Sequence, residues 1–176
     1  MLKYQIAISG AASAELSDEI LQLAYEVGKE IGLQGHITLT GACGGIGVSA
    51  VRGAKSAGGN TLGIAPADGR HDAHFETVSE YLDTIVYTGA GYKGRNVIFI
   101  RSADAVITIN GKSGTLSEAC MAIGEKRPLI VLKGSGACAD NLLQICTLLG
   151  EDAPLVREAS SPKEAVALAL EMLSKK

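Results

Sequence analysis

The sequence predicts a three-layer αβα domain of the α/β class, Rossmann-like, with a mainly parallel sheet between two layers of helices. Short, continuous apolar runs typical of strands buried on both faces alternate along the chain with segments of helical periodicity. Right-handed connections between parallel strands place such helices on both faces of the sheet. The 176 residues contain no repeat or linker-like stretch, and we expect a single domain over residues 1–176.

The expected strands are short runs rich in aliphatic and β-branched residues, and most are bounded by glycine, proline or polar residues. In chain order they lie at 4–9, 36–40, 60–65, 84–87, 105–109 and 128–132, with a short edge strand at 155–157. The stretch between 68 and about 83 is polar and irregular, and we expect a loop there with one short helix at most.

The expected helices connect these strands. The segment 14–33 is the clearest, because its apolar residues recur at helical spacing: Leu16, Ile20, Leu23, Val27 and Ile31. Further helices are expected after the loop 41–47 up to about 57, from about 96 to 103 and at 139–149, and another helix opens over 111–118. The last helix begins at Ser161, which forms a capping box with Glu164, and Pro162 lies in its first turn.

Composition and charge exclude several classes of protein. No apolar run approaches the about 18 residues needed to span a bilayer, so we expect no membrane association. The net charge is −3 and no basic cluster is present, so a nucleic-acid polymer is not an expected partner. The first residues enter a strand pattern at once and leave no room for a signal peptide, which predicts a cytoplasmic protein.

The sequence offers no evident site for a metal or a redox cofactor. The four cysteines are widely spaced without a C-x-x-C pair, and we expect buried free thiols. The run His71-Asp72-Ala73-His74 has no further cluster of ligands to complete a metal site. A solvated loop is the simpler interpretation of this run.

Glycine-rich loops follow four of the expected strands, and this predicts where a ligand binds. The loops contain Ser9-Gly10, residues 41–47, residues 89–94 and residues 111–114. In an open parallel sheet, ligands bind in the crevice beyond the carboxyl ends of the strands. All four loops would lie at that edge, so we expect them to form one crevice.

The loop at 41–47 has the composition of an anion-binding turn. Its glycines, Gly41, Gly44, Gly45 and Gly47, lie where a strand turns into a helix, and exposed N–H groups there suit a phosphate. Residues 45–50 also fit the dinucleotide pattern G-x-G-x-x-G/A, but the next strand ends in Ala65-Pro66 where a ribose-binding acid is needed. A tight turn with close helix packing explains the same glycines.

The second loop contains Gly111, Lys112, Ser113, Gly114 and Thr115. It resembles the P-loop (Walker A) of nucleoside-triphosphate-binding proteins only superficially, because Val106 occupies the position of the first glycine that this motif requires. We expect its N–H groups and the Thr115 hydroxyl to face a phosphate at the start of a helix. Thr115 and Glu118 also fit a capping box, in which Glu118 would have no catalytic role.

Arg95 lies in the glycine-rich segment after the fourth strand. A guanidinium there suits two-point binding of a phosphate or a ribose. The alternative is an ordinary surface arginine on the first turn of a helix. Ser9 and Gly10, at the end of the first strand, complete the set of expected ligand-binding residues.

These motifs resemble the Lonely Guy (LOG) family of nucleotide-binding proteins, historically labelled "lysine decarboxylase-like", over residues 4–133. The family signature Pro-Gly-Gly-x-Gly-Thr-x-x-Glu is matched at Gly111, Gly114, Thr115 and Glu118, and its preceding arginine at Arg95. Further matches are the glycine turn at 41–47, the helix at 50–59 and the run 102–104.

The chain departs from the family pattern at three positions. Asn110 replaces a proline, Lys112 replaces a glycine, and Asn96 stands where many members have lysine. The Arg95-Asn96 pair is more similar to an uncharacterised prokaryotic subgroup close to molybdenum-cofactor carrier proteins.

The resemblance implies a phosphoribohydrolase that cleaves a nucleoside 5′-monophosphate into free base and ribose 5-phosphate. Glu118 would stabilise the oxocarbenium-like transition state or activate water, and Arg95 would position the substrate. The glycine loops would hold the 5′-phosphate, and no cofactor is expected. The alternative is a carrier that binds a nucleotide or the molybdenum cofactor without turnover.

The resemblance also implies a homodimer or a higher homo-oligomer. The sequence adds one hint of its own, an apolar pattern at 97–99 beside the expected site.

Overall fold

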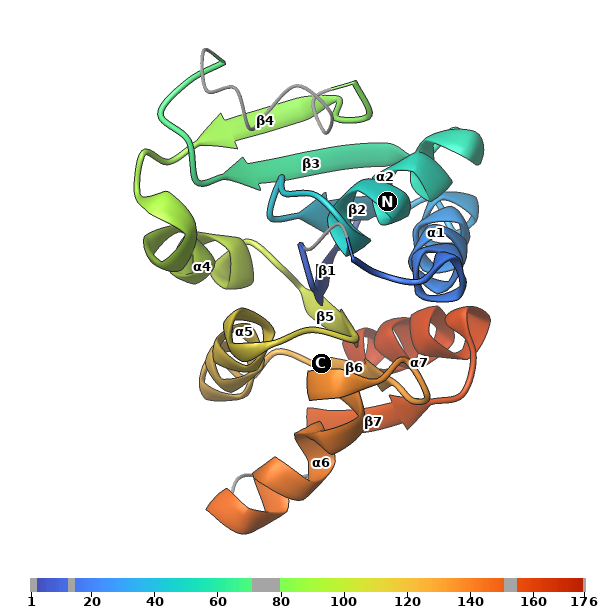
Figure 1. Cartoon of the computed structure of the whole chain (residues 1–176). Coiled ribbons are helices and arrows are strands. Elements are labelled where there is room, and N and C mark those ends of the chain that lie inside the picture. Colours follow the sequence, from blue (N-terminus) through green and yellow to red (C-terminus); the bar gives the residue numbers. More distant parts are fainter. Residues whose placement is uncertain (1–2, 13–14, 71–79, 151–154, 176) are drawn as a thin grey trace.

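A seven-stranded, entirely parallel sheet runs through the protein in the computed structural model (Figure 1), which describes residues 3–12, 15–70, 80–150 and 155–175. The strands are β1 (Gln5–Gly10), β2 (Ile37–Thr40), β3 (Asn60–Ala65), β4 (Thr84–Tyr87), β5 (Ala105–Ile109), β6 (Leu129–Leu132) and β7 (Val156–Ala159). Their order across the sheet is β4-β3-β2-β1-β5-β6-β7. The predicted three-layer α/β class is confirmed.

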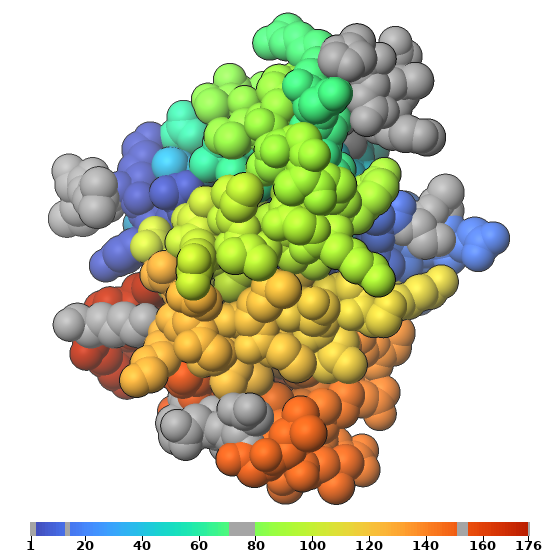
Figure 2. Space-filling model, turned by 90° about the vertical axis from the view of Figure 1, so that its left-hand side faces the viewer, coloured from blue at the N-terminus to red at the C-terminus, as the bar shows by residue number. Residues whose placement is uncertain are grey.

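Helices cover both faces of the sheet. They are α1 (Asp18–Leu33), α2 (Ile46–Ser56), α4 (Gly91–Arg101), α5 (Ser113–Gly124), α6 (Ala137–Leu149) and α7 (Pro162–Ser174). One face carries α1, α2 and α7, and the other carries α4, α5 and α6. Figure 2 looks onto the second group, whose colours run from green through yellow to orange. Within the described ranges, each helix is too short or too polar to traverse a lipid bilayer.

Alternating side chains of the central strands build two separate cores. On β1, Ile6 and Ile8 belong to the core beneath α1, α2 and α7, whereas Ala7 faces the opposite layer. On β5, Ile107 belongs to the core beneath α1, α2 and α7, and Val106 faces the opposite layer. Because both faces are buried, the strands read as continuous apolar runs, which is the pattern that predicts this fold class from the sequence.

Helix α4 begins at Gly91, five residues before the predicted start. The segment 91–95 contains two glycines, and these predict a loop because glycine disfavours helix. Tertiary contacts override that preference, since the Gly91 N–H donates to the carbonyl of Pro66 at 3.1 Å and Arg95 and Asn96 are buried. Two smaller differences are that α1 begins at Asp18, capped by Ser17, and that β7 extends to Ala159. The loop prediction for 68–83 falls largely on residues 71–79, which lie outside the described residues.

The strand order reverses at β1, and this positions the site. The chain proceeds from β1 to β2 on one side and returns to place β5 on the other. The loops that leave the carboxyl ends of β1, β2 and β5 therefore separate around a crevice.

Closely packed glycines set the distance between α1 and α2, and Gly28 and Gly53 make the tightest approaches. A methyl group on Gly28 would lie 1.8 Å from the carbonyl oxygen of Ala50, and one on Gly53 would lie 1.9 Å from that of Tyr25. Both neighbours are backbone atoms, which cannot rotate away. The close packing fixes α2, and with it the glycine loop that precedes this helix.

We predict that Gly53→Ala lowers the free energy of unfolding by about 1–3 kcal/mol or more, because the two helices must separate to admit a methyl group. Gly124→Ala, at the end of α5, is the matched control, since no atom lies within 4 Å of its added methyl group. Urea denaturation followed by circular dichroism measures both variants. Equal midpoints would contradict the packing argument.

Candidate functional site

A pocket of about 300 Å³ opens at the carboxyl ends of β1, β2 and β5, where the strand order reverses. Its size falls in the range of small-molecule sites. Most of the residues predicted from the sequence line it, namely Gly10, Gly41, Gly44, Gly47, Arg95, Lys112, Ser113, Gly114, Thr115 and Glu118. The expected convergence of glycine loops on one crevice therefore matches the position of this pocket.

Three of the predicted residues lie just outside the lining. Ser9 is buried below the pocket and contacts Glu118. Gly45 is the N-cap residue of α2, with φ 60°. Gly111 has φ 98°, and a side chain there would collide with Thr115. These glycines shape the two loops rather than face the cavity.

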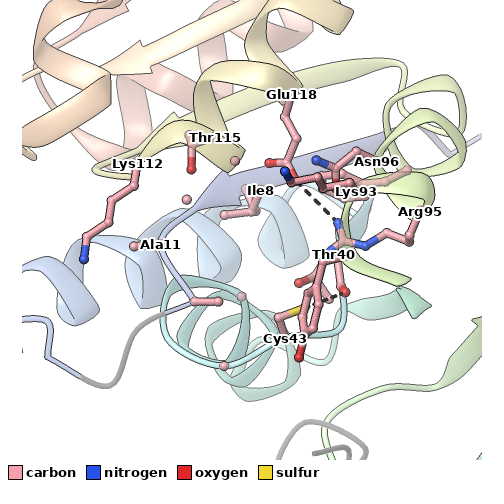
Figure 3. Close-up of a pocket in the computed structure, with 18 of the residues that line it drawn as sticks. Ile8, Ala11, Thr40, Cys43, Lys93, Arg95, Asn96, Lys112, Thr115 and Glu118 are labelled. Atoms are coloured by element: carbon pink, nitrogen blue, oxygen red, sulfur yellow. Dashed lines mark hydrogen bonds and ion pairs between the residues drawn. The ribbon is translucent and has the colours of Figure 1, made fainter. Parts of the chain in front are cut away.

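A buried carboxylate cluster, formed by Ser9, Arg95 and Glu118, lies at one side of the pocket. The Ser9 hydroxyl donates to Oε2 of Glu118 at 2.5 Å, and Nη1 of Arg95 lies 3.4 Å from Oε1. Figure 3 shows the side chains of Arg95 and Glu118 pointing toward each other. Burial raises the pKa of Glu118, and the Ser9 hydrogen bond and the Arg95 charge only partly oppose that shift.

This cluster decides between the two interpretations of Glu118. A capping box would turn its carboxylate back toward the backbone of Thr115. Instead both oxygens contact other elements, and the N-cap residue of α5 is Lys112, without a side-chain cap. The capping-box alternative is therefore wrong.

Arg95 is held in a fixed place against the backbone of Gly41. It is 5% exposed, so the alternative of a surface arginine is also wrong. Its Nη2 lies 3.3 Å from the sulfur of Cys43, and its guanidinium carbon lies 5.3 Å from the centroid of the Phe99 ring. A methyl group on Gly41 would lie 2.3 Å from Nη1, so only glycine leaves room for this guanidinium.

Three of the described helices begin at the pocket, and these three have no side-chain cap. The N-cap residues are Gly45 for α2, Ala90 for α4 and Lys112 for α5. Of the described helices that do not line the pocket, α1 and α7 are capped by serine side chains, and α6 begins at Gly136 without a side-chain cap. The first N–H groups of a helix have no intrahelical partner and carry partial positive charge. Together the three helix ends make the pocket attractive to an anion.

The start of α5 leaves the clearest space for such an anion. No atom lies within 4 Å of the position that a Gly114 side chain would occupy. Figure 3 shows Lys112 beside this helix end, on the side of the pocket away from Arg95. Lys112 has φ −125°, an extended conformation open to any residue, so the lysine that replaces a family glycine causes no strain.

Asn110, which replaces a family proline, has a structural role. It adopts φ 54°, and its side chain donates to the carbonyl of Ser135 at 2.8 Å. Its Oδ1 also accepts from the N–H of Gly111 at 2.7 Å. The asparagine thus ties the α5 loop to the loop after β6.

Sequence reasoning missed several residues that line the pocket: Cys43, Tyr92, Lys93, Asn96 and Phe99. The last four lie on α4. Once this helix begins at Gly91, their spacing places them on one helix face, and that periodicity was the available signal.

No group of three or more metal-ligating side chains occurs among the residues that the structure describes. His71 and His74 lie outside that part of the chain.

Solved structures include proteins similar to this one over nearly the whole chain. One is the molybdenum cofactor binding protein from the phototrophic bacterium Rippkaea orientalis, 31% identical, with a TM-score of 0.83 over 98% of this chain and 99% of that one. Another is the molybdenum cofactor carrier protein of Chlamydomonas reinhardtii, 30% identical, with a TM-score of 0.82 over 99% and 100% of the two chains.

Comparison of sequences agrees with this. An uncharacterised protein of Archaeoglobus fulgidus is 34% identical over 129 residues, which are 73% of this chain and 80% of that protein. The profile of the SLOG cluster4 family matches residues 3–166. The LOG-like resemblance drawn from the motifs is confirmed, and the chain belongs to the SLOG cluster4 family.

Proposed function

We propose that the protein is a carrier that binds a phosphorylated heterocyclic molecule of the molybdenum-cofactor class and does not turn it over. The observation that carries this proposal is the uncapped start of α5, where open space beside Gly114 meets Lys112 within the pocket. A phosphate placed there would accept from helix N–H groups and gain from the helix dipole.

The charge around the pocket supports an anionic ligand. Lys93, Arg95 and Lys112 line it, and Glu118 is the single acidic residue among the described lining residues. The charge of Glu118 is already compensated by Arg95. The lysines therefore remain for the ligand.

Likeness to known proteins supports the class of ligand. Two solved proteins named for binding or carrying the molybdenum cofactor match nearly the full chain at about 30% identity. The cofactor's pterin part ends in a phosphate, which the α5 helix end suits. In this proposal the cofactor is the cargo of the protein and takes part in no reaction on it.

The arrangement of Glu118 favours binding over catalysis. Its two oxygens contact Ser9 and Arg95, and it is 8% exposed. A general base must direct an oxygen lone pair at the water that it activates. Each Glu118 oxygen already uses one of its two lone pairs on Ser9 or Arg95, which leaves fewer for a water than an unpaired carboxylate has.

N-glycosidic hydrolysis of a nucleoside 5′-monophosphate is the second candidate function. It is favoured by one observation, that Glu118 and Arg95 both line the pocket. Water would add across the bond and release free base and ribose 5-phosphate, while the Glu118 carboxylate faced the developing positive charge.

The oligomer expected from the family is a further part of this proposal. Val97 and Ile98 are exposed on α4, and a second copy of the chain would cover them. Light scattering at micromolar concentration would show a dimer or a larger assembly, and a monomer would refute it.

Incubation with candidate ligands tests what the protein binds. The protein is incubated separately with molybdenum cofactor, released anaerobically from a molybdenum enzyme, and with AMP, GMP, CMP and UMP. Gel filtration and mass spectrometry measure molybdenum in the protein fraction, and chromatography measures free base. We expect retained molybdenum and no free base. Release of base would replace the carrier with the hydrolase, and retention of none of these ligands would contradict both functions.

The site is tested in the same assay with Gly114→Ala, which we expect to reduce affinity about tenfold or more by obstructing the N–H groups of α5. Its stability should stay equal or rise by up to about 1 kcal/mol, because alanine favours helix. Gly124→Ala is the matched control on the same helix, away from the pocket. Unchanged affinity in Gly114→Ala would exclude the proposed phosphate position.

The variant Glu118→Gln separates carrying from catalysis. In a carrier, this variant has no turnover to lose, and folded protein should still retain the ligand. Its free energy of unfolding should fall, because glutamine can accept from Ser9 but leaves the buried Arg95 without a carboxylate partner. In a hydrolase, loss of the charge should slow base release by orders of magnitude while AMP still binds. Base release at the wild-type rate would end any catalytic role for Glu118.

A further inference from the structure

Tyr92 is a large aromatic side chain at the pocket that the fold does not use. It lies in the first turn of α4, lines the pocket and is 59% exposed. Neither its ring nor its hydroxyl makes a hydrogen bond, ion pair or ring contact with another described residue. Removing the ring would therefore cost the folded protein little.

The position of Tyr92 on its helix directs it to the pocket. Residues three, four and seven positions later lie on the same helix face, and these are Arg95, Asn96 and Phe99. All three are buried and line the pocket. Tyr92 is the outermost member of this row, so its ring lies at the mouth of the cavity.

Aromatic side chains are scarce in this chain, so a solvent-exposed one beside a pocket is notable. The chain contains five tyrosines, two phenylalanines and no tryptophan. A tyrosine ring offers a flat apolar face and a polar edge, which suits stacking against a planar heterocycle. Stacking of a base on an aromatic side chain tolerates many ring types, because every base has a π-face.

We propose that Tyr92 is the stacking platform for the planar heterocycle of the bound ligand, and that it makes the pocket select phosphates that bear such a heterocycle over sugar phosphates that lack one. This inference rests on the proposed phosphate position at α5. The phosphate would bind at Gly114 and the heterocycle would lie across the mouth, against α4. Purine and pterin rings both meet this requirement, and inorganic phosphate and ribose 5-phosphate do not.

Two variants test the platform. Tyr92→Phe keeps the ring, and Tyr92→Leu keeps apolar area but removes the flat face. Isothermal titration with AMP and with ribose 5-phosphate measures affinity for wild type and both variants. We expect Tyr92→Leu to bind AMP about 5- to 100-fold more weakly, with ribose 5-phosphate unchanged. Tyr92→Phe should bind both ligands as wild type does.

Tyrosine fluorescence gives a second readout, because the chain has no tryptophan. AMP should change the emission of wild type, and this change should shrink in Tyr92→Leu. A merely structural role for Tyr92 would instead lower thermal stability, which we expect to be the same in all three proteins.

The outcomes separate this inference from the proposed function. If wild type binds AMP and ribose 5-phosphate with equal affinity, Tyr92 is not a stacking platform, and the phosphate site is unaffected. The same conclusion follows if Tyr92→Leu weakens the binding of AMP and of ribose 5-phosphate equally. Should wild type bind neither, retention of molybdenum cofactor decides: weaker retention by Tyr92→Leu than by Tyr92→Phe supports the platform, and equal retention overturns it. If wild type retains none of the three ligands, the proposed function fails as well.

Discussion

The uncapped ends of α2, α4 and α5 are the constraint on which the rest of the site depends. In a parallel sheet, the helix that follows each strand begins at the same edge, so its N–H groups point toward the same space. Away from the pocket, Ser17 and Ser161 cap α1 and α7, whereas α6 begins at Gly136 without a side-chain cap. At the pocket the N-cap residues offer no acceptor, and the positive potential is left for a ligand.

The buried pair of Arg95 and Glu118 holds the walls of this pocket together. It joins α4 to α5, and Ser9 links the same carboxylate to β1. Burying two charges is costly unless each has close partners, and removing one would leave the other unpaired. The sequence predicts that Gly41 binds a phosphate. In the structure, a glycine is required at this position because only glycine leaves space for the Arg95 guanidinium. Packing and ligand binding thus make demands on the same glycine loop.

The fold could be predicted from the sequence because buried parallel strands leave an unambiguous pattern of apolar runs. The edge of the sheet at which the pocket opens could be predicted as well. The start of α4 was misplaced because Gly91 and Gly94 disfavour helix locally, and this hid the row of residues that begins with Tyr92. The partnership of Ser9 with Glu118 could not be predicted, since the two residues are 109 positions apart and only the tertiary structure brings them together.

The central claim is that helix N–H groups at the pocket bind an anion, and amide chemical shifts measure this directly. In a ¹⁵N-labelled sample titrated with inorganic phosphate, the largest shifts should occur at Ser113, Gly114 and Thr115, with smaller ones at Gly47. The amide of Gly124, at the other end of α5, should not move. Shifts concentrated away from the pocket, or uniform small shifts across the protein, would contradict anion binding by these helix ends.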